Sequence, residues 1–523
     1  MNELLRKWQK EILYGLGILI LATFLRLYNL TTLPVFGDEA IYIRWAQVMR
    51  AEPSLRFLPL SDGKQPLFMW VVIPFFKIFS DPLFASRFVS ALVGIGTLIG
   101  IFILSYNLFK NIKLSLFASL ICAISPYSIF FDRLALADSM LSMFGIWSFI
   151  FALIAAKKLR ADYAMLSGFS LGGALLTKSP GIFFVGLIPL SWLLNKWSTK
   201  FKEKVNTFSV LVLLFSLTYS IAFGLYNILR LGVNFHMISI RNKDYVYPVS
   251  HLFTRPLDPL IPFLKQIIEY FWLLGPSFLI LLVVIGFYYG LKNKKKETLL
   301  LTAWGILPIL MVAEFSKTIT ARYIYFSLPY LFILAGFSIA AAKKNLGVNL
   351  IHLKGGLALH LRKLIILLLI TFIIHALFVD YQLLTKTEKV DLPRSERSGY
   401  LEGWTSGYGI REAADFIREE YKKEPNKKIV VGTEGYFGTL PDGLQIYLND
   451  LSEITVIGVG IDLKEIPVQL VESKDAGNKT FFVINASRLM TDYEKLNLNL
   501  IAAYPKAVKP DGSRDVLYLF ELD

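Results

Sequence analysis

The first 384 residues of the chain alternate between long apolar runs and short polar connections. A helix of about 20 apolar residues crosses a bilayer core of about 30 Å, and runs close to that length recur throughout this region. They predict membrane spans at 11–30, 83–108, 114–131, 137–156, 162–178, 180–195, 206–228, 271–291, 297–314, 322–341 and 364–384. The pattern therefore predicts an α-helical polytopic membrane protein with about 11 transmembrane helices.

The pattern changes after this membrane domain, residues 1–384. Residues 385–400 are polar, charged and marked by Pro and Gly, which is typical of a linker. Residues 401–523 then mix an amphipathic helical stretch with short apolar strands, and we expect a small α/β domain there. The stretches that carry this prediction are 408–423 for the helix and 427–435, 454–460, 479–487 and 515–523 for the strands.

Two polar connections, residues 31–82 and 229–270, are too long to be simple turns. Long loops in a compact protein are usually functional or disordered, and the many aromatic residues here argue against disorder. Within the first loop, Ile41, Trp45, Val48 and Met49 recur at helical spacing, which predicts an amphipathic helix.

The basic balance of the chain, a formal net charge of +15, is explained by its distribution. Lys and Arg concentrate in every second connection between the predicted spans, which places them on one side of the membrane, at 6–10, 110–113, 157–160, 196–204, 292–296 and 343–363. Such loops are cytoplasmic, so we expect a cytoplasmic N-terminus and extracytoplasmic loops 31–82 and 229–270 and C-terminal domain. The charge therefore does not indicate a nucleic-acid partner, and the single cysteine excludes a disulfide within the chain.

Adjacent carboxylates, Asp38 and Glu39, follow the first predicted span. An acid pair at a helix N-terminus is favourable next to the helix dipole and needs no function. The other interpretation is a general base at the edge of the bilayer, where partial burial can tune its pKa.

Further charged residues lie at the same predicted outer boundary. Lys64 precedes an apolar stretch and is either a Lys that extends to the membrane surface or a contact for a lipid phosphate. Asp132 and Arg133 end one span and Asp138 opens the next, and a carboxylate beside a span indicates function unless it forms a structural pair with Arg133.

Two more cations, Lys178 and Arg322, lie beside predicted spans, the first next to a helix-breaking Pro–Gly pair. A guanidinium can bond two phosphate oxygens at once. Acids combined with Lys and Arg at one boundary suit a donor with its phosphate at the interface and its tail in the bilayer. A lipid-linked glycan transporter would place such groups near the midplane, and a non-catalytic scaffold would leave the cluster unexplained.

The chain also resembles a known family. The acid pair, "KQPL" (family form K-P-P-L), "SRFVSALVG", "RLALAD", "LLTKSPG" and "RYIYFSLPY" together resemble the GT-C fold, polyprenol-phosphate-sugar-dependent glycosyltransferases. This group includes the protein O-mannosyltransferases and the lipid A aminoarabinose transferases. The resemblance covers most of residues 1–340, and the motifs occur in the family's order.

The resemblance implies an enzyme that moves a sugar from a polyprenyl-phosphate donor to a lipid, glycan or protein acceptor, with inversion at the anomeric carbon. The modest loops and the lack of recognisable ER-type domains favour the plasma membrane over the ER as its location. It implies that Asp38 is the base, supported by Glu39, and that Asp138 is a second acid of the site. The donor phosphate would be contacted by Lys64 and Arg322, with Lys178 and Arg133 behind them.

Two departures from the family pattern bear on the substrate. Ile41 stands where the aminoarabinose transferases usually have an Arg, and Gln65 replaces the first Pro of K-P-P-L. Both features argue against an aminoarabinose donor. No obligatory cofactor is expected, although Asp38, Glu39 and Asp138 could hold one divalent cation through oxygen ligands.

Overall fold

The computed structural model describes residues 2–275, 278–342, 356–496 and 498–522; the predicted basic residues Lys343, Lys344 and Lys354 lie outside them. The chain divides into two compact units. The first contains Met1–Tyr28, Arg56–Phe68 and Phe88–Leu384, and the second contains Asn29–Leu55, Met69–Arg87 and Thr385–Asp523.

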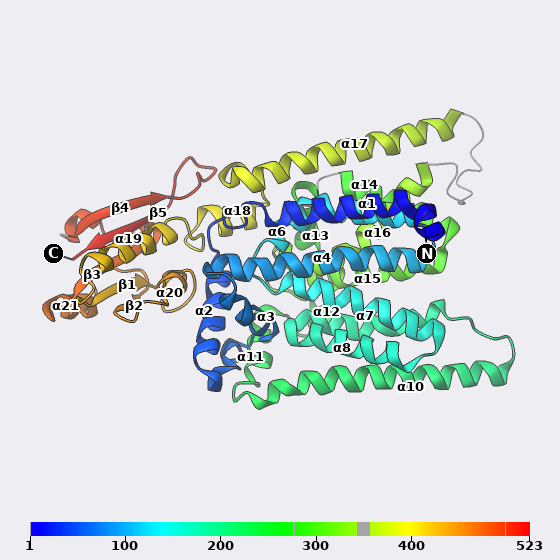
Figure 1. The fold of residues 1–523 in the computed structure, drawn as a ribbon, viewed down its shortest axis with the longest axis horizontal. Helices are drawn as coiled ribbons and strands as arrows, with labels where there is room; N and C mark the ends of the chain where they lie inside the picture. The colour runs from blue at the N-terminus through cyan, green and yellow to red at the C-terminus, as the bar shows by residue number, and fades with distance from the viewer. Residues whose placement is uncertain (1, 276–277, 343–355, 497, 523) are drawn as a thin grey trace. The chain divides into compact units, whose positions relative to one another are not determined.

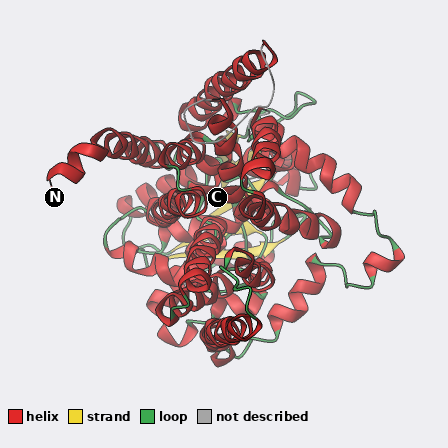
Figure 2. Cartoon of the chain, turned by 90° about the vertical axis from the view of Figure 1, so that its right-hand side faces the viewer, coloured by secondary structure: helices red, strands yellow, loops and turns green. Residues whose placement is uncertain are grey.

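The first unit is helical, and its long helices run alongside one another (Figures 1 and 2). The α-helices that lie wholly or mainly in it are α1 (Asn2–Leu27), α4 (Pro82–Phe109), α5 (Ile112–Ile124), α6 (Pro126–Asp132), α7 (Asp138–Lys158), α8 (Ala161–Thr177), α9 (Ile182–Leu187), α10 (Phe201–Tyr226), α11 (Met237–Tyr245), α12 (His251–Thr254), α13 (Leu260–Leu273), α14 (Phe278–Asn293), α15 (Lys295–Phe315), α16 (Leu328–Ala342) and α17 (Gly356–Thr385). Its 3-10 segments are η2 (Leu58–Asp62), η4 (Ser179–Gly181), η5 (Ile188–Leu194), η6 (Asn227–Leu231) and η7 (Ala321–Ser327).

The polytopic membrane fold is confirmed, but the number of spans differs from the predicted number. Six helices among the described residues are long and apolar enough to cross a membrane, and two bent helix pairs raise this number to eight. The sequence had predicted about 11 because each apolar run was counted separately. In the structure α8 has only 17 residues, and 179–194 is broken into short 3-10 and α-helical pieces.

A buried polar cluster joins α1, α6 and η7 inside the first unit. Nε of Arg26 lies 2.9 Å from Oδ2 of Asp132, and the hydroxyl of Tyr325 donates to the other carboxylate oxygen at 2.7 Å. Arg26 also donates to the carbonyls of Cys122 and Ala123 at the end of α5. The ion pair therefore satisfies helix-end carbonyls that would otherwise be buried without a partner.

The space for this cluster depends on a glycine. A Cβ atom added to Gly94 on α4 would lie 2.3 Å from the carboxyl carbon of Asp132. Any larger residue would therefore displace the Asp132 carboxylate from Arg26. This explains the small residue at the end of the "SRFVSALVG" motif in packing terms.

The second unit contains a mixed five-stranded sheet. Its strands are β1 (Ile429–Glu434), β2 (Ile454–Gly460), β3 (Lys479–Asn485), β4 (Asn499–Pro505) and β5 (Val516–Glu521), in the order β2-β1-β3-β5-β4. The first three strands are parallel, and β5 runs antiparallel to both β3 and β4. Four of the five strands and the α/β class were predicted, while β4 was missed.

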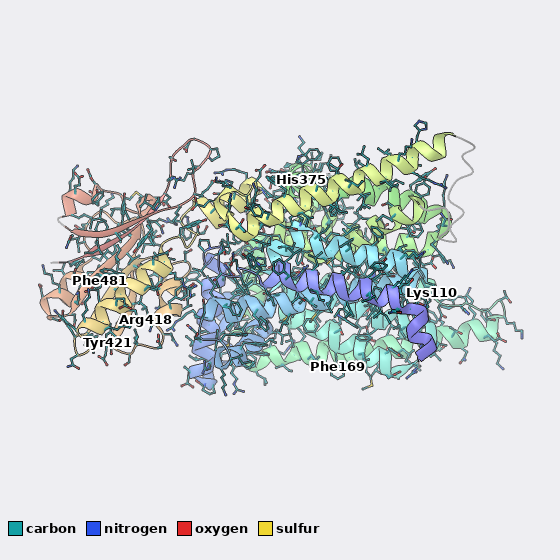
Figure 3. The ribbon with its side chains drawn as sticks, turned by 45° about the horizontal axis from the view of Figure 1, so that its top comes forward. Lys110, Phe169, His375, Arg418, Tyr421 and Phe481 are labelled. Carbon is teal, nitrogen blue, oxygen red and sulfur yellow. The ribbon has the colours of Figure 1, made fainter. Side chains whose placement is uncertain are left out.

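Helices cover both faces of the sheet. These are α19 (Ile410–Lys423), α20 (Asp442–Leu448) and α21 (Val468–Asp475). Phe416 of α19 packs on Phe481 of β3, while Leu470 of α21 packs in a cluster with the next strand residue, Phe482. Successive strand residues point to opposite faces, so α19 and α21 lie on different faces; Figure 3 labels Arg418 and Tyr421 on α19 and Phe481 on β3.

The remaining segments of the second unit are short, apart from α2. They are α2 (Gly37–Ala51), η1 (Pro53–Leu55), α3 (Leu67–Val72), η3 (Ile73–Lys77), η8 (Thr387–Lys389), α18 (Arg394–Arg397), the π-helical η9 (Ser398–Glu402), η10 (Ala486–Arg488) and η11 (Tyr493–Leu496). The predicted linker at 385–400 thus carries short helical turns, and Glu402 accepts from Arg394 and Arg397. The amphipathic helix predicted in loop 31–82 is confirmed as α2.

We predict that Asp132→Asn destabilises the protein by about 3–5 kcal/mol, because it leaves the buried Arg26 without its counter-charge. Thermal unfolding of the purified protein measures this change. Asp162→Asn is the matched control, because the Asp162–Arg160 pair is more than half exposed and solvent screens such pairs, so that they contribute little to stability. Equal unfolding temperatures for the two variants would contradict the prediction.

Candidate active site

Glu39 forms a fully buried ion pair with Arg87 of α4, within the second unit. Nε and Nη2 of Arg87 lie 2.8 and 2.7 Å from the two carboxylate oxygens, and both side chains have 0% exposure. The remaining Arg87 donors bind the carbonyls of Leu30, Leu33 and Pro34. One guanidinium thus binds three backbone carbonyls of the segment that leads into α2.

The same carboxylate also begins the helix. Glu39 accepts from the backbone N–H of Phe36 at 3.0 Å, which completes one half of a capping box at the start of α2. Both oxygens of Glu39 therefore have structural partners. Its neighbour Asp38 lies in the first turn of α2 and is half-buried. Sequence reasoning missed Arg87, although "SRFVSALVG" contains it.

The C-terminal part of the second unit fixes α2. The N–H of Gly37 donates to the carbonyl of Thr405 at 3.1 Å, and Phe36 forms an isolated β-bridge with Ser406. Further along, the amide of Gln47 donates to the carbonyl of Ile446 on α20 at 2.9 Å. Residues far apart in the sequence therefore hold Asp38 in place.

Asp38 lines a cavity of about 340 Å³ in this unit. The opposite walls come from the C-terminal part of the chain and include Trp404, Glu434, Thr439 and Arg488. No motif in the sequence indicated this cavity, because its walls are brought together only by the fold.

Glu434 is an unusual carboxyl group in the cavity wall. It is 5% exposed and accepts from the backbone N–H and the side-chain amide of Asn485, at 2.8 and 2.7 Å. Burial raises the pKa of Glu434 to about 7, against the opposing effects of Asn485 and the nearby Lys506 and Arg488. At neutral pH this group can therefore both donate and accept a proton.

A second group of predicted site residues comes together in the first unit. Nζ of Lys178 lies 2.6 Å from Oδ1 of Asp138 and 5.3 Å from the ring centre of Tyr323, while the Arg322 guanidinium lies 5.5 Å from the same ring. Neither the Asp138–Lys178 pair nor Tyr323 was predicted. Two cations at one aromatic ring, one of them paired with an acid, can hold an anion of a bound substrate.

Lys64 is linked to this group through its sequence neighbour. The Gln65 amide donates to the Ser179 hydroxyl at 2.9 Å, so "KQPL" and "LLTKSPG" are joined directly. This gives a structural role to Gln65, the residue that departs from the family form. Lys64 itself lies 3.4 Å from Asp62, which also binds Arg241 of α11 at 2.8 Å.

The backbone at Gly63 makes this arrangement possible. Gly63 has a positive φ of 68°, and a Cβ there would lie 2.7 Å from Cβ of Arg241. Glycine is therefore required both for the turn and for the close approach of α11. The cation Arg241, within loop 229–270, is a further residue that the sequence analysis missed.

Arg133 contacts the end of α1. Its Nη1 donates to the carbonyls of Leu25, Arg26 and Tyr28 at 3.1, 3.2 and 2.7 Å. These bonds satisfy the last carbonyls of a helix, as a cation at a C-terminus commonly does. The structure therefore gives Arg133 a structural task, and its predicted place behind the donor phosphate stays a prediction.

The structure thus gathers the predicted residues into two groups. Asp138, Lys178, Arg322 and Lys64 belong to one region of the first unit, and Asp38 with Glu39 belongs to the second unit. Each group is built by the fold from segments that are distant in the sequence.

The carboxylates do not offer a ready metal site. Both oxygens of Glu39 bind Arg87, and Asp138 binds Lys178. Within the described part of the chain, no group of three or more His, Cys, Asp or Glu residues is arranged to hold a metal ion. The donor set therefore gives no support for a divalent cation held by Asp38, Glu39 and Asp138 together.

Comparison with known proteins agrees with the sequence motifs. Residues 63–221 match the family model of the dolichyl-phosphate-mannose-protein mannosyltransferases. This segment includes Lys64, Arg133, Asp138 and Lys178, while Asp38, Glu39 and Arg322 lie outside it. No curated protein sequence matches the chain.

Solved structures match nearly the whole chain. ArnT from Cupriavidus metallidurans is similar in its apo state (TM-score 0.55, 14% identity, 97% of each chain covered) and bound to undecaprenyl phosphate (0.57, 14%, 98% of each chain). The archaeal oligosaccharyltransferase AglB from Archaeoglobus fulgidus, solved with an inhibitory peptide and a dolichol-phosphate, matches at TM-score 0.50 and 11% identity. That match covers 98% of this chain and 74% of AglB. The expected GT-C fold is thereby confirmed, and the chain is a multi-pass membrane protein of that fold. The family match over residues 63–221 agrees with the resemblance that the motifs carry.

We predict that Arg87→Met destabilises the protein by about 3–5 kcal/mol, because it leaves Glu39 buried and uncompensated. Arg411→Met is the control, since Arg411 pairs with Asp81 in the same unit but is 43% exposed. Thermal unfolding compares the two. If the unfolding temperature of Arg87→Met fell no further than that of the control, the Glu39–Arg87 pair would not organise the start of α2.

The raised pKa of Glu434 predicts that the stability of the protein depends on pH. Because its pKa is raised from 4.5 to about 7 in the fold, its stabilising contribution is complete below pH 4.5 and is lost as the pH rises through 7. The loss amounts to at most about 3 kcal/mol. Unfolding temperatures measured from pH 4.5 to 8 should fall more for wild type than for Glu434→Gln, which cannot ionise. Parallel curves would contradict the prediction.

Proposed function

We propose that this membrane protein of GT-C fold is a glycosyltransferase that moves a sugar from a polyprenyl-phosphate donor to an acceptor at the outer face of the membrane. The observation that carries the proposal is that Lys178, which is paired with Asp138, and Arg322 both approach the ring of Tyr323. Asp138 and Lys178 lie within the segment that matches the mannosyltransferase family model. The acceptor class is a lipid, a glycan or a protein.

The charges at the two ends of α7 support a site at the outer face of the membrane. The helix begins at Asp138 and ends at Lys158, so its 21 residues separate the two ends by about 30 Å, the thickness of a bilayer core. At the basic end Lys157 interacts electrostatically with Lys110 and Lys294 from two other predicted cytoplasmic loops; Figure 3 labels Lys110 at the end of α4. We therefore place Asp138 outside and the N-terminus in the cytoplasm of a cell with the protein in its plasma membrane.

The donor phosphate would be held by cations from separate segments. Lys178 and Arg322 approach one ring, and Lys64 is joined to the same region through Gln65 and Ser179. A phosphate bound here would draw Lys178 away from Asp138 or share it, and the guanidinium of Arg322 could bond two phosphate oxygens. ArnT has been solved with undecaprenyl phosphate and AglB with a dolichol-phosphate.

Asp38 is proposed as the general base. The acceptor hydroxyl or amine would give its proton to the Asp38 carboxylate. At the same time the acceptor's oxygen or nitrogen would attack the anomeric carbon. The bond to the lipid phosphate breaks, and the phosphate leaves with the bonding electron pair. A single displacement of this kind inverts the anomeric carbon. Glu39 supports Asp38 by holding the start of α2 through Arg87.

The test separates the two proposed roles. Asp38→Asn should lower sugar transfer by about 10²–10⁴-fold, since it removes a general base, while a polyprenyl phosphate still co-purifies with the protein. Lys64→Ala should instead reduce the co-purified polyprenyl phosphate. Transfer is followed with the purified full-length protein, and the lipids are identified by mass spectrometry, which also gives the mass of any attached sugar.

Matched controls are available at exposed positions. Asp162→Asn and Lys200→Ala change the same residue types at exposed positions and should change neither measurement. Full transfer activity in Asp38→Asn would refute the base assignment. Bulk phospholipid alone in both wild type and Lys64→Ala would refute the proposed donor class.

A further inference from the structure

The cavity beside Asp38 has an aromatic rim supplied by the C-terminal domain. Trp404, Tyr436 and Phe437 line it and are 42%, 69% and 61% exposed. Single exposed hydrophobic side chains are common on protein surfaces and need no explanation. Three exposed aromatic side chains gathered around one cavity are instead typical of a binding site.

The cavity also contains an unused polar group. Thr439 is 2% exposed and lines the cavity, and its hydroxyl has no hydrogen-bond partner among the described residues. Buried polar atoms are almost always paired, because leaving one unpaired is unfavourable. The Thr439 oxygen is enclosed in the cavity wall, so a ligand hydroxyl reaches it only with a small shift of that wall. The Glu434 carboxyl also lines the cavity; its oxygens accept from Asn485 and keep lone pairs for a further hydroxyl.

The walls of the cavity are held in place from behind. The buried amine of Lys506 donates to the carbonyls of Gly403 and Ser406 at 3.0 and 2.8 Å, on either side of Trp404 and Thr405. In the opposite wall the N–H of Gly438 donates to Asp442 at 2.6 Å. Such preorganisation lowers the entropy cost of binding.

We propose that this cavity binds a sugar ring of a neutral saccharide acceptor beside Asp38. Aromatic faces suit the apolar C–H faces of a pyranose, and Thr439 and Glu434 suit its hydroxyls. Two carboxyl groups in the lining, Asp38 and Glu434, disfavour a phosphorylated acceptor. The volume of about 340 Å³ lies at the low end of small-molecule sites, about 300–1,000 Å³, which favours one or two rings over a long segment.

This inference rests on the proposed function, because it assigns the acceptor class to a site that Asp38 lines. Arg488, which also lines the cavity, does not make it favourable for a phosphorylated acceptor. Its guanidinium lies 4.4 Å from the Trp404 ring centre and 3.2 Å from Asp462, so its charge is already shared with an aromatic face and an acid.

The test uses the full-length protein in lipid nanodiscs, free of glycoside detergents that would compete for the cavity. Saturation-transfer NMR measures the binding of N,N′-diacetylchitobiose, of glucosamine 1-phosphate and of a threonine-containing peptide. The neutral disaccharide should bind wild type. Trp404→Ala should raise its Kd about tenfold, because it removes an aromatic face, and Thr439→Val should raise it severalfold, because it removes one hydrogen bond.

Trp272→Ala is the matched control, because Trp272 is 57% exposed in the other unit and lies outside the cavity. It should leave the Kd unchanged, and unfolding temperatures confirm that the variants fold. Equal disaccharide binding by wild type and Trp404→Ala, absence of disaccharide binding, tighter binding of the phosphorylated sugar, or binding of the peptide alone would each overturn the proposal.

The outcome is separable from that of the proposed function. Asp38→Asn should retain disaccharide binding while losing transfer. If transfer depends on Asp38 but the Trp404 variant binds the disaccharide normally, the acceptor assignment fails and the transferase assignment stands. If transfer does not depend on Asp38, the base assignment fails whatever the disaccharide does.

Discussion

The buried pair of Glu39 and Arg87 constrains the chain around the candidate base. A charge with no exposure is tolerated only when its partners are complete, and here one guanidinium satisfies a carboxylate and three backbone carbonyls at once. The entry into α2, the first turns of α4 and the position of Asp38 are therefore coupled. Changing any one of these segments would leave a buried charge or a buried carbonyl without its partner.

The charged residues of the first unit follow a related logic. Arg26 and Asp132 are fully enclosed and bind one another and helix ends. Lys178, by contrast, is 22% exposed and Lys64 24% exposed, so these amines can exchange their carboxylate partners for an incoming anion at smaller cost. Exposure therefore separates the fully enclosed charges that hold the membrane domain together from the partly exposed cations of the proposed donor site.

The sequence predicted the parts of the structure that depend on local pattern. Apolar runs, amphipathic spacing and short strands located α2, most of the long helices and four of the five strands. It failed where tertiary contacts decide: β4 pairs only at the sheet edge, α8 and 179–194 are shorter or broken, and Asp132 pairs with Arg26, 106 positions away. The cavity beside Asp38 was out of reach because Thr439, Trp404 and Glu434 carry no shared motif and meet only in the fold.

The length of α7 ties the candidate site to the lipid around it. A rigid helix with Asp138 at one end and Lys157 and Lys158 at the other acts as a gauge of hydrocarbon thickness. In a thinner or thicker bilayer the helix must tilt, or the lipid must deform, at a cost of fractions of a kcal/mol per Å. In the proposed orientation, either response moves the Asp138–Lys178 pair relative to the headgroups. Bilayer composition thus becomes a variable of the site, acting through hydrophobic mismatch and without contact with any substrate.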